Sequence, residues 1–177
     1  MIRNPLVGAV RDAAPVPVEV VERLTENLFS KMAAGKKYEF LSPGQAQGTL
    51  AGLLSSNPAM EERELFMRLG KGMEADGVLA GYLYRWVERE GAEYGVNRPA
   101  SVAFDLYLIQ SSNGAILWKG GFDKAQQSLS ENILDIDTFL KAKGKWMSVE
   151  ELAEMGLSAL VERFPAGTVE GESRKGE

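Results

Sequence analysis

The chain of 177 residues contains no cysteine and no histidine. Without thiols it can form neither a disulfide framework nor a thiolate zinc site. Without imidazoles it lacks the commonest general base and the commonest metal ligand in proteins. Any catalysis would have to use carboxylate, hydroxyl, amide or ammonium groups. No cofactor is therefore expected, and no catalytic or metal-binding residue stands out.

The sequence also lacks long apolar runs and a strong charge of one sign. No run approaches the ~20 apolar residues that a membrane-spanning helix needs. The start, MIRNPLVGAV, has neither the apolar stretch nor the cleavage site of a secretory signal. A net charge of −5 argues against a nucleic-acid partner, because such binders normally carry a basic face. The length and the apolar fraction of 45% fit one globular domain.

Apolar residues spaced by three and four predict amphipathic helices over residues 18–32, 59–74 and 149–164. Ser148 and Glu151 form a capping-box pattern at the start of the last of these. Prolines at positions 5, 15 and 17 predict an extended lead-in over residues 1–17. We expect a single domain over residues 18–164 and a disordered tail over 165–177.

Alternating apolar residues predict three consecutive antiparallel strands over residues 77–87, 101–110 and 115–123, with Asn113-Gly114 at the tight turn. A further short strand is expected over residues 37–41. The predicted fold class is α/β (α+β). It has a mixed sheet of about four strands, in which a three-stranded antiparallel meander (77–123) is packed by helices 18–32, 59–74 and 149–164.

On two of these strands, the face of the sheet on which a polar or aromatic side chain lies matters for function. Strict alternation over 77–87 places Tyr82, Tyr84 and Trp86 on one face of the sheet. Asp105 interrupts the otherwise apolar strand 101–110. A buried carboxylate can be tuned for acid–base chemistry, but no second carboxylate or histidine accompanies it. The favoured interpretation is that Asp105 lies on a solvated face of the sheet or is satisfied by a nearby hydroxyl or amide. A small-molecule-binding or hydrolytic enzyme that uses only carboxylates and hydroxyls is the alternative function.

The polar, glycine-containing link over residues 88–99 is the candidate binding segment. It joins two long strands and is much longer than a minimal hairpin turn, and loops held on a rigid sheet often carry function. Tyr94 and Arg98 within it are residue types enriched at interface hot spots. Trp86, near the end of its strand, is expected to be partly exposed. The candidate partner-binding residues are therefore Tyr94, Arg98 and Trp86.

A longer pattern carries a family resemblance. The segments Ala75-Asp76-Gly77-Val78-Leu79-Ala80-Gly81, Leu106-Tyr107-Leu108-Ile109 and Asn113-Gly114-Ala115-Ile116-Leu117-Trp118 resemble the α/β domain of bacterial envelope lipoproteins. Relatives of this kind include the N-terminal domain of the Tol-system translocation protein, the curli secretion lipoprotein and the activators of penicillin-binding proteins. Residues 99–104 through 126–132 look closer still to uncharacterised lipoproteins of Gram-negative bacteria. The lipobox cysteine and the first hydrophobic strand of such proteins are missing from this sequence.

The resemblance covers about residues 18–132 and implies a function without catalysis, since its motifs are structural. It implies a periplasmic domain that is anchored to the outer membrane, in the full-length form, by a lipid that these residues do not carry. The implied partner is another envelope protein in assembly, secretion or peptidoglycan synthesis. No nucleic acid is expected, and the oligomeric state is left open.

The missing ligands give the first testable expectation. Purified protein treated with a chelator should contain no stoichiometric zinc, haem or iron–sulfur cluster, because histidine and cysteine are the usual ligands of these groups. Elemental analysis by mass spectrometry checks this. An equimolar amount of zinc that survives the chelator would contradict it.

Overall fold

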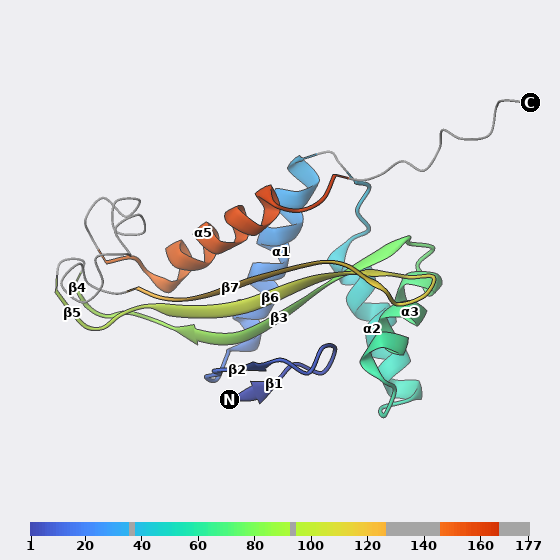
Figure 1. Ribbon diagram of the computed structural model, residues 1–177, viewed down its shortest axis with the longest axis horizontal. Helices are drawn as coiled ribbons and strands as arrows, with labels where there is room; N and C mark the ends of the chain where they lie inside the picture. The colour runs from blue at the N-terminus through green and yellow to red at the C-terminus, as the bar shows by residue number, and fades with distance from the viewer. Residues whose placement is uncertain (36–37, 93–94, 127–145, 167–177) are drawn as a thin grey trace, which may run out of the picture.

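The structure is a computed structural model that describes residues 1–35, 38–92, 95–126 and 146–166 (Figure 1). Its helices are α1 (Val18–Ala34), α2 (Pro43–Ser56), α3 (Glu62–Gly72) and α5 (Val149–Glu162). Its main sheet contains β3 (Gly77–Val87), β6 (Ser101–Gln110) and β7 (Ile116–Ala125), in the order β3-β6-β7. Two hairpins pair β1 (Ile2–Arg3) with β2 (Val10–Arg11) and β4 (Glu90–Ala92) with β5 (Gly95–Arg98).

The predicted α/β class and the antiparallel meander are confirmed. β3 and β6 have the predicted bounds, and β7 begins and ends slightly later than predicted. The turn between β6 and β7 uses the expected residues. Gly114 has φ +71°, which glycine adopts without steric cost, and the Ala115 N–H donates to Asn113 Oδ1 at 2.9 Å. Local turn chemistry therefore sets this hairpin.

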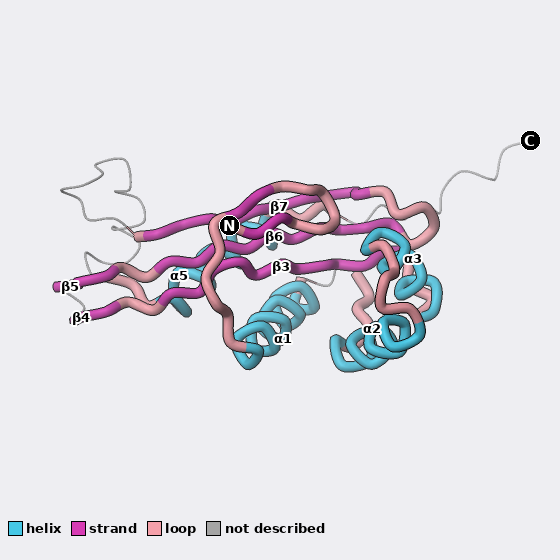
Figure 2. Tube along the Cα trace, turned by 90° about the horizontal axis from the view of Figure 1, so that it is seen from below, coloured by secondary structure: helices cyan, strands magenta, loops and turns pink. Residues whose placement is uncertain are grey.

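The central strand β6 is buried on both faces of the sheet. On one face, its residues Val102, Phe104 and Leu106 pack against α5, with α1 beyond (Figure 1). On the other face, Tyr107 and Ile109 pack with residues of α3 and of the β1–β2 hairpin (Figure 2). Layers on both sides thus cover the sheet, which explains why β6 reads as an almost continuous apolar run.

The periodicity of apolar residues predicts a core that contains Leu28, Leu69, Leu79, Leu83, Phe104, Leu106, Leu108 and Leu160. Of its residues, the fully buried ones are Leu69, Phe104, Leu106 and Leu160. The half-buried ones are Leu28, Leu79, Leu83 and Leu108. The half-buried residues lie on α1, on the edge strand β3 and at the end of β6, where fewer layers cover them.

Helices α1 and α5 run parallel and are joined by a ladder of polar contacts. Arg23 donates to Glu150 at 3.3 Å, Asn27 donates to Glu154 at 2.8 Å, and Lys31 donates to Ser158 at 3.2 Å. Each pair is separated by 127 residues, so one turn of α1 matches one turn of α5. Partly exposed pairs of this kind contribute little stability each. Their regular spacing instead fixes which turns of the two helices meet.

The alternation predicted for β3 is wrong beyond Tyr84. A β-bulge between Leu83 and Arg85 inserts Tyr84 into the strand. One extra residue reverses the alternation that follows it. Tyr82 and Tyr84 therefore face the β1–β2 hairpin, whereas Trp86 packs with the core under α1 and α5.

Two further segments differ from the prediction. Residues 38–41 form no strand. Instead, Phe40 packs edge-to-face against Phe29 and Tyr38 packs edge-to-face against Phe164, at centroid distances of 6.3 and 5.5 Å. The lead-in 1–17 contains the β1–β2 hairpin, turned at Gly8 with φ +72°. The predicted helix over residues 59–74 shortens to α3. Residues 36–37 and the tail beyond 166 lie outside the described residues, so the disordered tail stays a prediction.

The burial of β6 gives a second expectation. Leu106→Ala should lower the free energy of unfolding by ~2–5 kcal/mol, because it leaves a cavity in a packed core. Leu117→Ala is the matched control, since Leu117 is 56% exposed and its loss should cost less than about 0.5 kcal/mol. Urea denaturation measures both. Equal midpoints for the two variants would show that this face of β6 is not packed.

Candidate functional site

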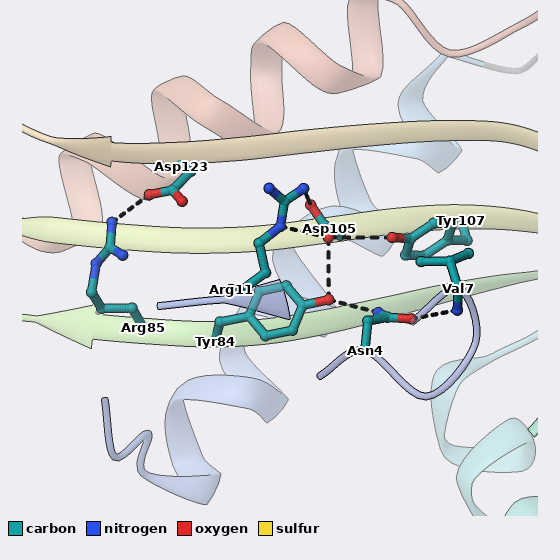
Figure 3. A network of polar contacts seen from close by, with 8 residues as sticks. All are labelled: Asn4, Val7, Arg11, Tyr84, Arg85, Asp105, Tyr107 and Asp123. Atoms are coloured by element: carbon teal, nitrogen blue, oxygen red, sulfur yellow. Dashed lines mark hydrogen bonds and ion pairs between the residues drawn. The ribbon is translucent and has the colours of Figure 1, made fainter. Parts of the chain in front are cut away.

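The most concentrated polar chemistry of the described chain surrounds Asp105, on the face of β6 that the β1–β2 hairpin covers (Figure 3). Asp105 is only 3% exposed. Arg11 donates to both of its oxygens, from Nε at 3.1 Å and from Nη2 at 2.9 Å. The hydroxyls of Tyr84 and Tyr107 donate to Oδ2 at 3.1 and 3.2 Å. The buried carboxylate is therefore fully compensated by charge and hydrogen bonds.

Three elements position these donors. Tyr107 lies two residues along β6 from Asp105 and so shares its face. Tyr84 reaches the carboxylate because the β3 bulge keeps it on this face. Arg11 comes from β2, 94 residues earlier in the chain than Asp105.

Asn4 extends the network into the N-terminal hairpin. It is fully buried, and its Nδ2 donates to the Tyr84 hydroxyl at 2.6 Å. Its Oδ1 accepts from the N–H groups of Leu6 and Val7 at 2.9 and 3.0 Å. The turn between β1 and β2 is thereby ordered by the same network that satisfies Asp105 (Figure 3).

The electrostatics of the network stabilise one protonation state. Burial, followed by the nearby Asp105 charge, raises the pKa of Tyr107 to about 12. Burial also raises the pKa of Tyr84 to about 12, against the opposing effect of the Asn4 hydrogen bond. The hydrogen bond to Asp105 raises the pKa of Arg11. At neutral pH both phenols are protonated donors and the guanidinium is charged.

This arrangement does not support the alternative of a carboxylate-and-hydroxyl enzyme at Asp105. Three donors contact Oδ2 and one contacts Oδ1, so the carboxylate is already engaged as an acceptor by groups of the protein itself. The phenols are poor nucleophiles while protonated. Asp105 thus does not lie on a solvated face but is satisfied by two hydroxyls, which is the other expected possibility, and by an arginine that makes two of the four donor contacts.

A second polar link crosses the same face of the sheet. From β3, Arg85 Nε donates to Ser101 Oγ at 2.6 Å, and Arg85 Nη2 contacts Asp123 Oδ1 of β7 at 2.5 Å. The register aligns Arg85, Ala103 and Asp123 across the three strands. The small side chain of Ala103 lets the arginine pass over β6. Arg85 thus ties together the two edge strands of the sheet.

The three predicted binding residues occupy different environments. Trp86 is half-buried, as expected, but it packs against the core on the α1–α5 face. Arg98 is an exposed residue of β5 and pairs with Glu90 of β4 at 2.5 Å. Tyr94 lies outside the described residues. The predicted link is thus in part a hairpin, which extends from one end of the sheet (Figure 1).

Within the described residues, no group of three or more carboxylates could hold a metal ion. Likewise, none of the described helices has the length and apolarity to cross a membrane. A hollow lined by Lys31, Tyr38, Phe164 and neighbouring residues encloses about 60 Å³, which is room for a few water molecules.

Sequence reasoning identified Asp105 but missed its partners Arg11, Tyr84, Tyr107 and Asn4. Tyr107 could have been found, because it lies on the same face two positions along the strand. Tyr84 required knowledge of the bulge. Arg11 and Asn4 belong to a proline-containing lead-in that carries no strand signal.

Comparisons with protein-family models, with curated proteins and with solved structures found no match. Any functional assignment therefore rests on the residues of this chain.

Removing the buried charge should destabilise the protein. Asp105→Asn keeps the size of the side chain but loses the ion pair and turns one acceptor into a donor that faces other donors. We expect a loss of about 1–3 kcal/mol of unfolding free energy, and not more, because Arg11 is 36% exposed and can be hydrated. Asp123→Asn is the control; its carboxylate is 45% exposed, and the loss should stay below about 1 kcal/mol. Urea denaturation at neutral pH would show the reverse order if Asp105 were not buried.

The raised tyrosine pKa values predict alkaline instability. Tyrosines in the unfolded chain ionise near pH ~10, whereas Tyr84 and Tyr107 have pKa values of about 12 in the folded protein. The folded state then binds more protons, so their contribution to stability is complete below pH ~10 and is lost as the pH rises through about 12. Tyr84→Phe should reduce this pH dependence of the unfolding free energy. An unchanged slope in the variant would contradict the assignment.

Proposed function

We propose that this protein is a non-enzymatic binding domain of the bacterial cell envelope. In its full-length form it is held at the outer membrane by a lipid and binds another envelope protein from the periplasmic side. The proposal rests on the resemblance of residues 18–132 to envelope lipoproteins, together with the surface of the β4–β5 hairpin.

The observation that carries the proposal is the exposed ion pair on this hairpin. Arg98 and Glu90 are 56% and 58% exposed, and they lie on a segment that extends from the end of the sheet (Figure 1). Exposed pairs contribute little to folding. Both side chains can therefore exchange their mutual contact for contacts with a partner, and arginine is enriched at such interfaces.

The way the hairpin is supported fits a binding role. Just before it, Glu88 Oε1 accepts from the Val149 N–H at the start of α5, at 3.3 Å. Arg89 donates to the backbone oxygen of Trp146. The base of the hairpin is thus fixed to α5, while Arg98 stays exposed. A rigid base with an exposed end lowers the entropy lost when a partner binds.

The test exploits the ion pair. The partner is first isolated from envelope extract by affinity capture and identified by mass spectrometry. Arg98→Glu should then weaken its binding by about tenfold or more if Arg98 contacts it. The double variant Glu90→Arg with Arg98→Glu restores an ion pair within the hairpin but should not restore binding.

A matched control lies on α3, where Arg68 pairs with Glu64 at similar exposure. Arg68→Glu changes the charge equally and should leave binding unchanged. Tyr94→Ala with Arg98→Ala should also weaken capture at a nearly constant melting temperature. Equal binding by wild type and all hairpin variants would remove the hairpin from the interface.

A further inference from the structure

The outer edge of β7 is unpaired within the described residues, because β7 pairs only with β6. At the end of β7, the Gln126 N–H donates to the Ala100 oxygen at 3.1 Å. Antiparallel alternation then directs the N–H and C=O groups of every second residue away from β6. These outward residues, all exposed, are Lys119, Gly121, Asp123 and Ala125. Among the described residues, these backbone donors and acceptors of β7 have no partner strand.

The other edge of the sheet is protected. β3 carries the bulge at Tyr84, and the Tyr84 oxygen accepts from the Ala14 N–H at 2.9 Å. Bulges and covering segments are common devices against edge pairing. β7, in contrast, pairs with β6 without interruption from Trp118 to Ala125. Of the two edges, only β7 keeps the regular geometry that a further strand requires.

We propose that β7 pairs antiparallel with β7 of a second copy of this chain, about a two-fold axis at Gly121. Lys119 then lies opposite Asp123 of the second copy, and symmetry repeats this pair. Opposite charges that face each other across strands are stabilising. The two three-stranded sheets would join into one continuous sheet.

The charges select this register. An axis at Lys119 would place Lys119 opposite Lys119 of the second copy, and an axis at Asp123 would place Asp123 opposite Asp123. Both arrangements bring like charges together and are repulsive. An axis at Gly120 or Phe122 leaves Lys119 opposite Gly121 or Ala125, without a charge partner. An axis between two residues would place backbone groups that point away from β6 in one copy opposite groups that point toward β6 in the other. The two β7 strands could then form no regular hydrogen bonds. Only the axis at Gly121 pairs both charges.

The side chains near the axis permit this approach. A Cβ on Gly121 would lie 2.6 Å from Asp105 Oδ1 and 3.5 Å from Arg11 Nη2, so glycine leaves the axis open beside the guanidinium. Arg11 is already neutralised by Asp105. Arg85 contacts Oδ1 of Asp123, which leaves Oδ2 for a second cation. Within the described residues, Lys119 forms no ion pair of its own.

The first test is sedimentation velocity on the full chain from about 10 µM to about 1 mM, because an edge-strand contact is small and typical of weak association. Wild type should show a concentration-dependent dimer. Lys119→Glu should raise its dissociation constant at least about tenfold, and Lys119→Pro should abolish it by removing an outward N–H that β6 does not use. Lys71→Glu on α3 makes the same charge change away from the edge and should dimerise like wild type. A wild-type monomer at every concentration, or equal loss in the Lys71 control, would overturn the proposal.

The second test determines the register by disulfide formation between introduced cysteines, because the natural sequence contains none. Lys119→Cys and Asp123→Cys proteins are oxidised separately and as a mixture. Opposed residues of a ladder are within disulfide reach, whereas identical positions in this register are offset by about 13 Å. The mixed disulfide should therefore form faster than either symmetric one. Symmetric disulfides that form as fast as the mixed one would reject the axis at Gly121.

Discussion

The buried carboxylate of Asp105 is the constraint on which much of this structure depends. A charge in the middle of a covered strand is costly unless cations and hydrogen-bond donors surround it. The fold meets this requirement from three directions, with Arg11 from the N-terminal hairpin, Tyr84 from the bulge of β3 and Tyr107 from the same strand. Compensation of a single side chain thereby couples the first residues of the chain to the centre of the sheet.

That coupling gives the two faces of the sheet different characters. Under α1 and α5 the contacts are apolar, and the ladder of contacts 127 residues apart sets the register of the helices. Under the β1–β2 hairpin, a polar network forms much of the contact and continues through Asn4 into the hairpin turn. An apolar face tolerates many side chains of similar volume, whereas the polar face requires particular partners. The polar face is therefore the more specific half of the fold.

The two surfaces that we propose for binding differ in their distance from the Asp105 network, since the β4–β5 hairpin extends from the end of the sheet whereas Gly121 on the β7 edge lies beside Asp105 and Arg11. The charged groups of the Asp105 network are engaged with one another. The exposed features that we propose for binding are the β4–β5 hairpin at the end of the sheet and the outer edge of β7. Both surfaces belong to, or extend from, strands that contact the buried network or the start of α5. A sheet that presents a hairpin and a strand edge is consistent with the binding function that we propose.

The sequence by itself determined the elements whose signals are local. The alternation over residues 101–110, the Asn113-Gly114 turn and the Ser148–Glu151 capping box all form as predicted, because each depends on neighbours within a few residues. Asp105 could be singled out as a polar residue in a buried strand for the same reason.

Only the tertiary structure decided the features that depend on distant residues. The bulge that sends Trp86 to the opposite face from Tyr84 arises in the pairing of β3 with β6. Residues 38–41 pack as aromatics against α1 and the end of α5 instead of forming a strand. Arg11 pairs with Asp105 across 94 residues, and no local pattern specifies that contact. At buried positions, packing and the compensation of charge by distant residues override the local preference for helix or strand.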